Sequence, residues 1–386
     1  KGDGVTDDTE AINRALFEVY CRTASPSAKK ILYFPAGKYK VSDGINVPSD
    51  ATIKGEGINN TIITQTANPN YVSYVMTTAD NKQQIGAQIG YNGASLPHNI
   101  TIIDMTLEAS GDGFWLDKAS SVTLDRVGMT GINVLPTSEG NSATGIYIIG
   151  STLSPPTDIN IVDCNIEKFN YGILQEGTEY SRNIVCNSTT FSQLFKGIML
   201  CDVGGMVNTM TVSNCVFDLI NSRAIDANYV TNLTSTFNSY RDVANNYLGI
   251  GNAIDNIINF GQNSVGCASI NDQFDRTQTE SYNSYAWVYG NSKTVMLAAG
   301  HELRIGLWEQ ASGSSYVLSP NETNQLVGLS FNMNDLSGNQ KIQYLEETSN
   351  KHEQFVRWWD KFDVMERSIP VNSVYNMRTE ILFIKK

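Results

Sequence analysis

Residues 99–107 read NITIIDMTL, and the same nine-residue pattern recurs as SVTLDRVGM at 121–129, DINIVDCNI at 158–166, NIVCNSTTF at 183–191 and TMTVSNCVF at 209–217. In each copy apolar residues alternate with polar ones, which predicts a strand with one buried face. An Asp or Asn at the sixth position, replaced by Arg126 and Ser188 in two copies, predicts a turn. The ninth residue is apolar again and returns to the core. The five segments are therefore predicted to form equivalent strand–turn–strand units.

Each copy is followed by a second short apolar strand that opens with Gly or Ala. These strands read GFWLD at 113–117, GIYII at 145–149, GILQE at 172–176, GIMLC at 197–201 and AIDAN at 224–228. Successive copies of the first pattern start 22, 37, 25 and 26 residues apart. A unit of this length cannot bury its apolar face alone, so neighbouring units must stack.

The stacked units predict an all-β chain with a right-handed parallel β-helix over residues 1–275. Leucine-rich repeats have a similar length, but their Leu-x-x-Leu-x-Leu framework is absent. A β-sandwich would alternate in the same way without repeating one order of strand, turn and strand.

The first 30 residues are predicted to cap the open end of the helix. GDGVTDDTEAI at 2–12 leads into an amphipathic helix with Asp7 or Asp8 as the N-cap. The segments 31–41 (ILYFPAGKYKV) and 51–57 (ATIKGEG) then predict the first rungs. A capping helix would cover the unpaired edge of the solenoid, which would otherwise invite aggregation.

The three segments GDGVTDDTEAI, YFPAGKYKV and IKGEG together resemble the N-terminal cap of the pectate-lyase-like β-helix superfamily. That superfamily includes polygalacturonase-like enzymes and bacteriophage tailspikes. The resemblance covers residues 1 to about 275, and it specifies the fold far more closely than the activity. It implies a protein that acts on, or binds, polysaccharide.

Residues 276–386 are predicted to form a smaller β-rich C-terminal domain. Apolar strand-like segments occur at 286–289, 301–308, 325–331 and 379–384. In tailspikes such a domain joins three chains or binds a receptor, so the resemblance implies a homotrimer.

Composition excludes several functions. The net charge of −12 argues against a nucleic-acid partner, which needs a clustered basic surface. No apolar run is long enough to span a membrane, and no signal peptide opens the sequence. The six Cys and three His have no metal-type spacing, so neither a cofactor nor a metal is expected, and the thiols indicate assembly in a reducing compartment.

Outward positions of the Gly-led strands supply the candidate binding residues. The second residue after the Gly or Ala should point out of the helix, which gives one column across the five strands: Trp115, Tyr147, Leu174, Met199 and Asp226. Trp115 and Tyr147 are predicted to lie one above the other as a flat platform on which sugar rings could stack. The alternative is that loops or a neighbouring subunit cover both rings.

Candidate catalytic carboxylates lie in the same region. Asp117 and Glu176 share the fourth position of their strands, two rungs apart, which corresponds to ~9.6 Å between backbones. Side-chain rotation could bring them within the ~6.5–9.5 Å that inverting glycoside hydrolysis uses. Asp226 is an alternative partner for Glu176. All three could instead be ordinary solvated carboxylates of an acidic protein.

Other polar residues have structural explanations. Asp104, Asp163 and Asn214 are predicted to be turn residues, as is Asp112, and helix capping explains the acidic residues at 3, 7 and 8 better than a calcium loop does. The catalytic segments of polygalacturonase-like enzymes, such as Gly-His-Gly and Arg-Ile-Lys, are absent. Arg126, Arg182 and Lys196 are candidates for the base of a lyase, although no spacing distinguishes them.

Three functions remain. The first is a bacteriophage tailspike or virion appendage that binds, and as a further prediction depolymerises, host surface polysaccharide, alone or with other virion proteins. The second is a secreted bacterial polysaccharide lyase or glycoside hydrolase. The third is a structural virion decoration protein without enzymatic activity.

Overall fold

The computed structural model describes residues 1–21, 30–65, 74–78, 97–132, 143–149, 156–175, 180–200, 206–243, 257–261, 264–274, 288–290, 294–297, 302–312, 315–317, 330–332, 341–343, 362–371 and 376–385. From residue 274 onward, and at Asn271, the description is limited to the backbone.

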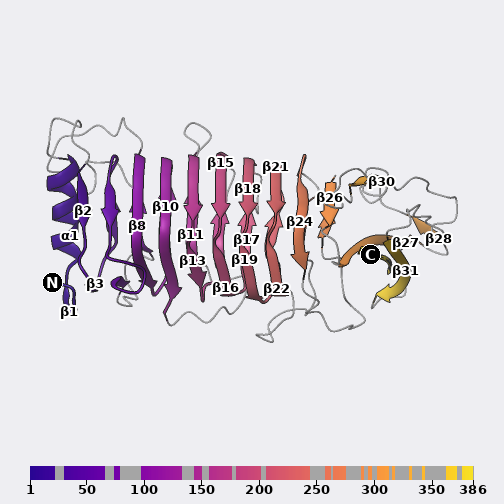
Figure 1. Cartoon of the computed structure of the whole chain (residues 1–386), viewed down its shortest axis with the longest axis horizontal. Helices are drawn as coiled ribbons and strands as arrows, with labels where there is room; N and C mark the ends of the chain where they lie inside the picture. Colours follow the sequence, from indigo (N-terminus) through magenta and orange to yellow (C-terminus); the bar gives the residue numbers. More distant parts are fainter. Residues whose placement is uncertain are drawn as a thin grey trace.

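Two parallel sheets form the body of the molecule (Figure 1). The described strands of the larger sheet number seventeen: β1 (Asp3–Asp7), β2 (Ile31–Tyr33), β3 (Gly37–Val41), β5 (Thr52–Lys54), β6 (Thr61–Gln65), β8 (His98–Ala109), β10 (Ser120–Gly131), β12 (Thr157–Val162), β13 (Asn165–Glu167), β15 (Tyr180–Asn187), β16 (Thr190–Leu194), β18 (Met206–Ser213), β19 (Val216–Ile220), β21 (Val230–Thr236), β22 (Ser239–Val243), β24 (Ala268–Phe274) and β26 (Thr294–Leu297).

The smaller sheet contains the Gly-led strands. Its nine described strands are β4 (Ile45–Val47), β7 (Tyr74–Thr78), β9 (Asp112–Asp117), β11 (Thr144–Ile149), β14 (Tyr171–Gln175), β17 (Lys196–Leu200), β20 (Ile225–Ala227), β23 (Ile258–Phe260) and β25 (Val288–Gly290). Each strand pairs in parallel with its equivalent in the next repeat, which confirms the predicted right-handed parallel β-helix.

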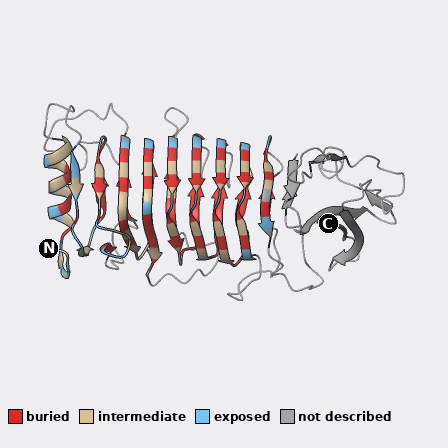
Figure 2. Ribbon diagram, viewed as in Figure 1, coloured by how far each residue is buried: buried red, intermediate tan, exposed pale blue. Residues whose placement is uncertain are grey.

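Successive repeats stack in the register that the nine-residue pattern predicts. Ile102 of β8 pairs with Leu124 of β10, and Leu107 pairs with Met129 after the turn. Inward residues are buried along the length of the helix, as Figure 2 shows. Three buried aromatic rings stack on one another in the interior of the β-helix. The ring centroids of Phe191 and Phe217 are 4.7 Å apart and those of Phe217 and Tyr240 are 5.0 Å apart, with the ring planes within 10° of parallel.

The sixth residue of each repeat has the left-handed backbone conformation expected of a turn residue, although Asp104 and Arg126 fall within the bounds of β8 and β10. Asp104, Asp163 and Asn214 have φ of 57°, 52° and 54°, in the left-handed region that Asp and Asn tolerate best. Arg126 and Ser188, the departures from the pattern, adopt the same conformation with φ of 51° each. The position in the repeat therefore dictates the backbone conformation even where the residue type does not favour it.

Glycine is the second residue of β9, β11, β14 and β17 because the next repeat approaches it closely. A Cβ on Gly145 would lie 2.7 Å from the carbonyl oxygen of Gly172, and one on Gly197 would lie 2.4 Å from that of Ala224. Atoms cannot approach to these distances without backbone movement, so a side chain is excluded here for steric reasons.

A short helix covers the N-terminal end, as predicted (Figure 1). Helix α1 spans Thr9–Leu16 and continues as one π-helical turn over Phe17–Cys21, with Ile12 and Leu16 buried against the first rungs. Asp8 occupies the N-cap position without a capping hydrogen bond from its side chain, whereas Asp7 accepts one from the Thr9 N–H at 3.0 Å.

The parallel sheets continue through β25 and β26 to Leu297, beyond the boundary predicted at residue 275. An antiparallel sheet follows, made of β27 (Glu302–Ser312), β28 (Ser315–Val317), β31 (Phe362–Val371) and β32 (Asn376–Lys385), together with the pair β29 (Ser330–Asn332) and β30 (Lys341–Gln343). The strand-rich C-terminal part is confirmed; its separation as a domain at residue 276 stays a prediction. No helix in the described segments is long and apolar enough to cross a membrane.

Candidate carbohydrate-binding face

The outer face of the nine-stranded sheet carries the column predicted from the Gly-led strands. Trp115 pairs in register with Tyr147, Tyr147 with Leu174, and Met199 with Asp226. In β9 the flanking residues Phe114 and Leu116 are fully buried in the core. Trp115 and Tyr147 are half-buried and therefore face outward from the helix.

The planes of the aromatic rings are inclined to one another, so the rings do not form a flat platform. The ring centroids of Trp115 and Tyr147 are 5.4 Å apart, but the ring planes meet at 77°. Tyr74, on the preceding strand β7, also contacts Trp115. Their ring centroids are 4.7 Å apart, and their ring planes meet at 45°. The prediction that the two rings lie side by side is confirmed, and the prediction that they are coplanar is wrong, because edge-to-face contact suits the ring quadrupoles better.

Asp112 fixes the orientation of the central ring. The Trp115 indole N–H donates to Asp112 Oδ2 at 2.6 Å, and the Thr144 backbone N–H donates to Oδ1 at 2.7 Å. Asp112 is 5% exposed and lies within β9, so the prediction that it is a turn residue is wrong. A buried carboxylate with two donors is a strong anchor, since removing either partner leaves the other unsatisfied.

Asp117 lies at the outer edge of the aromatic group with its side chain 44% exposed. Its backbone N–H donates to Thr78 Oγ1 at 2.8 Å, which holds the end of β9, and Lys118 Nζ lies 3.8 Å from its carboxylate. It pairs in register with Ile149 of β11. Glu176, the predicted catalytic partner, lies outside the described residues, so the acid pair stays a prediction.

Asp226 belongs to a buried ionic cluster. Its carboxylate accepts hydrogen bonds from Lys196 Nζ at 3.0 Å, Arg223 Nη1 at 2.8 Å and Asn259 Nδ2 at 2.8 Å. Burial alone would raise the pKa of Asp226, but Arg223 and Lys196 lower it below its usual value. A general acid needs a raised pKa, so these contacts support an ion pair and not a proton donor.

Asp226 and Asp117 are too far apart to act together. Four strand spacings separate β9 from β20 along the sheet, which corresponds to ~19 Å. This exceeds the ~6.5–9.5 Å of an inverting carboxylate pair by a factor of two.

The outer face changes character along the helix axis. Beyond Tyr147, the outward residues Leu174 and Met199 are 3% and 5% exposed and form, with Tyr171, a small apolar cluster outside the main core. Tyr147 packs against this cluster. The part of the column that solvent reaches is therefore the aromatic end, at Trp115 on β9 and Tyr147 on β11.

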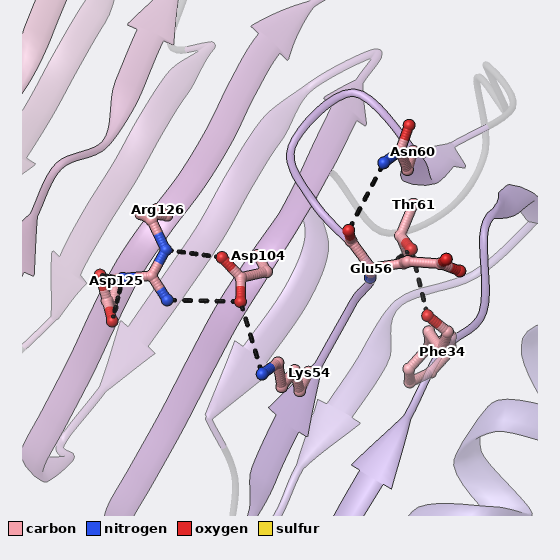
Figure 3. A network of polar contacts seen from close by, with 8 residues as sticks. All are labelled: Phe34, Lys54, Glu56, Asn60, Thr61, Asp104, Asp125 and Arg126. Carbon is pink, nitrogen blue, oxygen red and sulfur yellow. Dashed lines mark hydrogen bonds and ion pairs between the residues drawn. The ribbon is translucent and has the colours of Figure 1, made fainter.

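Two of the three candidates for a lyase base, Arg126 and Lys196, are engaged in ion pairs. Arg126 donates to Asp104 at 2.6 Å and to Asp125 at 2.7 Å, and Lys54 lies 3.8 Å from Asp104 (Figure 3). The hydrogen bond to Asp104 raises the pKa of Arg126 above its already high value, which makes it a poorer base. Lys196 is bound to Asp226, as described above, and Arg182 is an exposed residue of the larger sheet.

Two residues of the site, Tyr74 and Asp112, were not predicted from the sequence. Tyr74 lies on a strand that no Gly opens, so the repeat pattern does not identify it. Asp112 directly precedes Gly113, and Thr144, Tyr171, Lys196 and Arg223 hold the equivalent position in later strands. The run of polar residues at this position was a signal in the sequence. Among the side chains that the structure describes, no three His, Cys, Asp or Glu residues gather as a metal site would require.

Comparison with known proteins gives a relative from a phage. The chain is 27% identical over 206 residues to the pre-neck appendage protein of Bacillus phage B103, an alignment that covers 48% of this chain and 21% of the relative. The chain thus spans about a fifth of the length of that curated relative. The similarity agrees with the virion location predicted from the sequence.

Solved structures with a similar fold include the N-terminal fragment of gene product 12 of bacteriophage Phi29, with a TM-score of 0.47, 15% identity and coverage of 78% of this chain and 58% of that one. Another is ORF18 of Geobacillus virus E2, with a TM-score of 0.42, 15% identity and coverage of 82% of this chain and 66% of that one.

The sequence profile of the rhamnogalacturonase A/epimerase, pectate lyase-like family matches residues 1–222, more than half of the chain. The chain therefore belongs to this pectate lyase-like family.

Proposed function

We propose that this chain is the β-helical body of a phage virion appendage and that it binds host surface polysaccharide at the aromatic end of its nine-stranded sheet. The observation that carries the proposal is the group Tyr74, Trp115 and Tyr147, held on three neighbouring strands on the outside of the helix. Aromatic rings on a rigid scaffold are suited to sugars, because they offer apolar contact area at little cost in side-chain entropy.

The electrostatics of this end suit a neutral glycan, or one with few charges. Asp117 stands at the edge of the aromatic group, and Asp43 and Asp117 both raise the pKa of Tyr74, after the larger effect of its burial. Tyr74 therefore keeps its hydroxyl proton at neutral pH. A neutral hydroxyl can both donate to and accept from sugar hydroxyl groups.

A glycan array of purified bacterial surface polysaccharides tests the proposal. We expect the full chain to bind at least one polysaccharide, and Trp115→Ala and Tyr147→Ala to weaken that binding at least tenfold. Tyr33→Ala is the matched control, because Tyr33 is an exposed tyrosine on β2, in the other sheet. Equal loss of binding in the control, or unchanged binding in both site variants, would remove the aromatic group from the function. Failure to bind any glycan would favour a structural decoration protein.

Two finer parts of the proposal need separate tests. Depolymerisation rests on Asp117 and Glu176, and we expect Glu176→Gln to abolish the release of reducing ends while binding persists.

A homotrimer is expected to sediment with three times the 42.5 kDa of the chain. A stable monomer at micromolar concentration would instead favour a secreted enzyme.

A further inference from the structure

Two buried thiols lie in contact across successive turns of the helix. Cys186, in β15, is 0% exposed, and Cys215, in the turn between β18 and β19, is 1% exposed. Their sulfur atoms are 3.8 Å apart, and both cysteines are free thiols. Cys186 pairs in register with Val212 of the next repeat, so the contact joins two successive repeats.

This pair is distinguished from the other described cysteines by its geometry. Cys164 and Cys215 occupy equivalent turn positions with Thr189 between them, which places them two strand spacings, or ~9.6 Å, apart. Cys267 Sγ instead faces the carbonyl oxygens of Val230 and Val265. A disulfide needs sulfur atoms at ~2.05 Å and Cα atoms usually within ~7 Å. The sulfur atoms of Cys186 and Cys215 are already in contact at 3.8 Å, so closing the bond requires a local shift that brings them closer.

We propose that Cys186 and Cys215 are an oxidation site that cross-links two turns of the β-helix once the protein leaves a reducing compartment. The oxidant is a peroxide. Cys215 Sγ attacks one peroxide oxygen, the O–O bond breaks, and a sulfenic acid and one water form. Cys186 Sγ then attacks the sulfenic sulfur, forming the S–S bond and releasing a second water. Two thiols lose two electrons and two protons, and one hydrogen peroxide is reduced to two waters.

The order of the two steps follows from the hydrogen bond within the pair. The hydrogen bond with Cys186 lowers the pKa of Cys215, whereas burial raises that of Cys186. Cys215 is therefore the better first nucleophile, since the thiolate is the reactive form. Because burial excludes large oxidants, small peroxides should react and bulky disulfides should not.

The cross-link would stabilise the middle of the helix. The two cysteines are 29 residues apart in the chain, and closing a loop of that length is expected to shift the unfolding equilibrium by roughly 400-fold at 25 °C. The bond lies inside the core and would leave the outer face unchanged, so this inference does not depend on the proposed function.

Peptide mass spectrometry tests the site directly. The reduced full chain is treated with hydrogen peroxide under native conditions, and the remaining thiols are alkylated in guanidinium before digestion. We expect a disulfide-linked peptide pair containing Cys186 and Cys215, which should persist in Cys267→Ser and vanish in Cys215→Ser. Recovery of both cysteines as alkylated thiols, as separate sulfinic or sulfonic acids, or in bonds to other cysteines would overturn the proposal.

Unfolding in guanidinium provides a second readout on the wild-type chain alone. The oxidised chain should unfold at a higher denaturant concentration than the reduced chain, and dithiothreitol should reverse the shift. A cross-linked chain with an unchanged midpoint would contradict the stabilising role. This comparison needs no substitution, so a variant that failed to fold would not affect it.

Discussion

Replacing Asp272 by Asn should make the β-helix more stable at neutral pH and leave it nearly unchanged at acid pH. Asp272, in β24, is 1% exposed inside the helix. Its Oδ2 accepts hydrogen bonds from Ser235 Oγ at 2.5 Å and Ser269 Oγ at 2.7 Å, and its Oδ1 accepts from Asn238 N at 2.8 Å. An Asn amide fits the same site, since its oxygen accepts from Asn238 while its nitrogen donates to the two hydroxyls.

The magnitude follows from the pKa of this carboxyl. Burial raises the pKa of Asp272 from 3.8 to about 6, and the hydrogen bonds offset only part of that effect. A raised pKa means that the protonated form is favoured in the folded state. The contribution of Asp272 to the free energy of unfolding is thus fully present below pH 3.8 and is lost as pH rises through about 6. At neutral pH the free energy of unfolding is therefore lower by about 3 kcal/mol than it would be with Asp272 protonated.

Urea unfolding at pH 4.0 and pH 7.5, followed by circular dichroism, measures this effect. The difference in unfolding free energy between Asp272→Asn and the wild type should become more favourable to the variant by about 2.5 kcal/mol between the two pH values. The other titrating groups are the same in both proteins, so their contributions cancel in this difference. The same difference at both pH values would mean that burial does not raise the pKa of Asp272 in the folded state.

Asp226→Asn is the matched control with the opposite sign. Asp226 is as deeply buried, but Arg223 and Lys196 lower its pKa, so its contribution is present above pH 3.8 and is lost as pH falls below that value. This variant should be destabilised at pH 7.5, where the buried Lys196 and the partly buried Arg223 lose their counter-ion. A gain in stability at pH 7.5 would contradict the ionic cluster.

Three further predictions concern packing and the aromatic group. Gly145→Ala should lower the free energy of unfolding by ~1–3 kcal/mol, because its Cβ would lie 2.7 Å from the Gly172 carbonyl oxygen; an unchanged urea midpoint would contradict this close approach. Phe217→Ala should cost ~3–5 kcal/mol in the same assay, since it empties the centre of the aromatic stack, and a cost below 1 kcal/mol would mean that the core is loosely packed there. Asp112→Asn should weaken polysaccharide binding and shift the Trp115 signal in fluorine NMR of fluorotryptophan-labelled protein, whereas weaker binding with an unmoved signal would show that Asp112 does not orient the ring.

The repeating part of the structure could be predicted from the sequence because the same physical constraint acts in every rung. The alternation of apolar and polar residues predicts which side chains face inward. The sixth residue of the nine-residue pattern predicts the turns at Asp104 and its equivalents. The column from Trp115 to Asp226 follows from these two facts alone.

What lies over the outer face could not be predicted in this way. Leu174, Met199 and Asp226 point outward but are buried, and the segments between rungs have no period from which their paths could be inferred. The angle between the Trp115 and Tyr147 rings depends on Asp112, whose contact to the indole is specific to that rung. Tyr74 was missed because its strand lacks the opening glycine.

A crystal structure of the chain with an oligosaccharide from the best-bound polysaccharide tests the central claim most directly. We expect a sugar ring in contact with Trp115 and Tyr147, outside the nine-stranded sheet and within reach of Asp117. A glycan bound to the larger sheet, or only to the C-terminal strands, would contradict it.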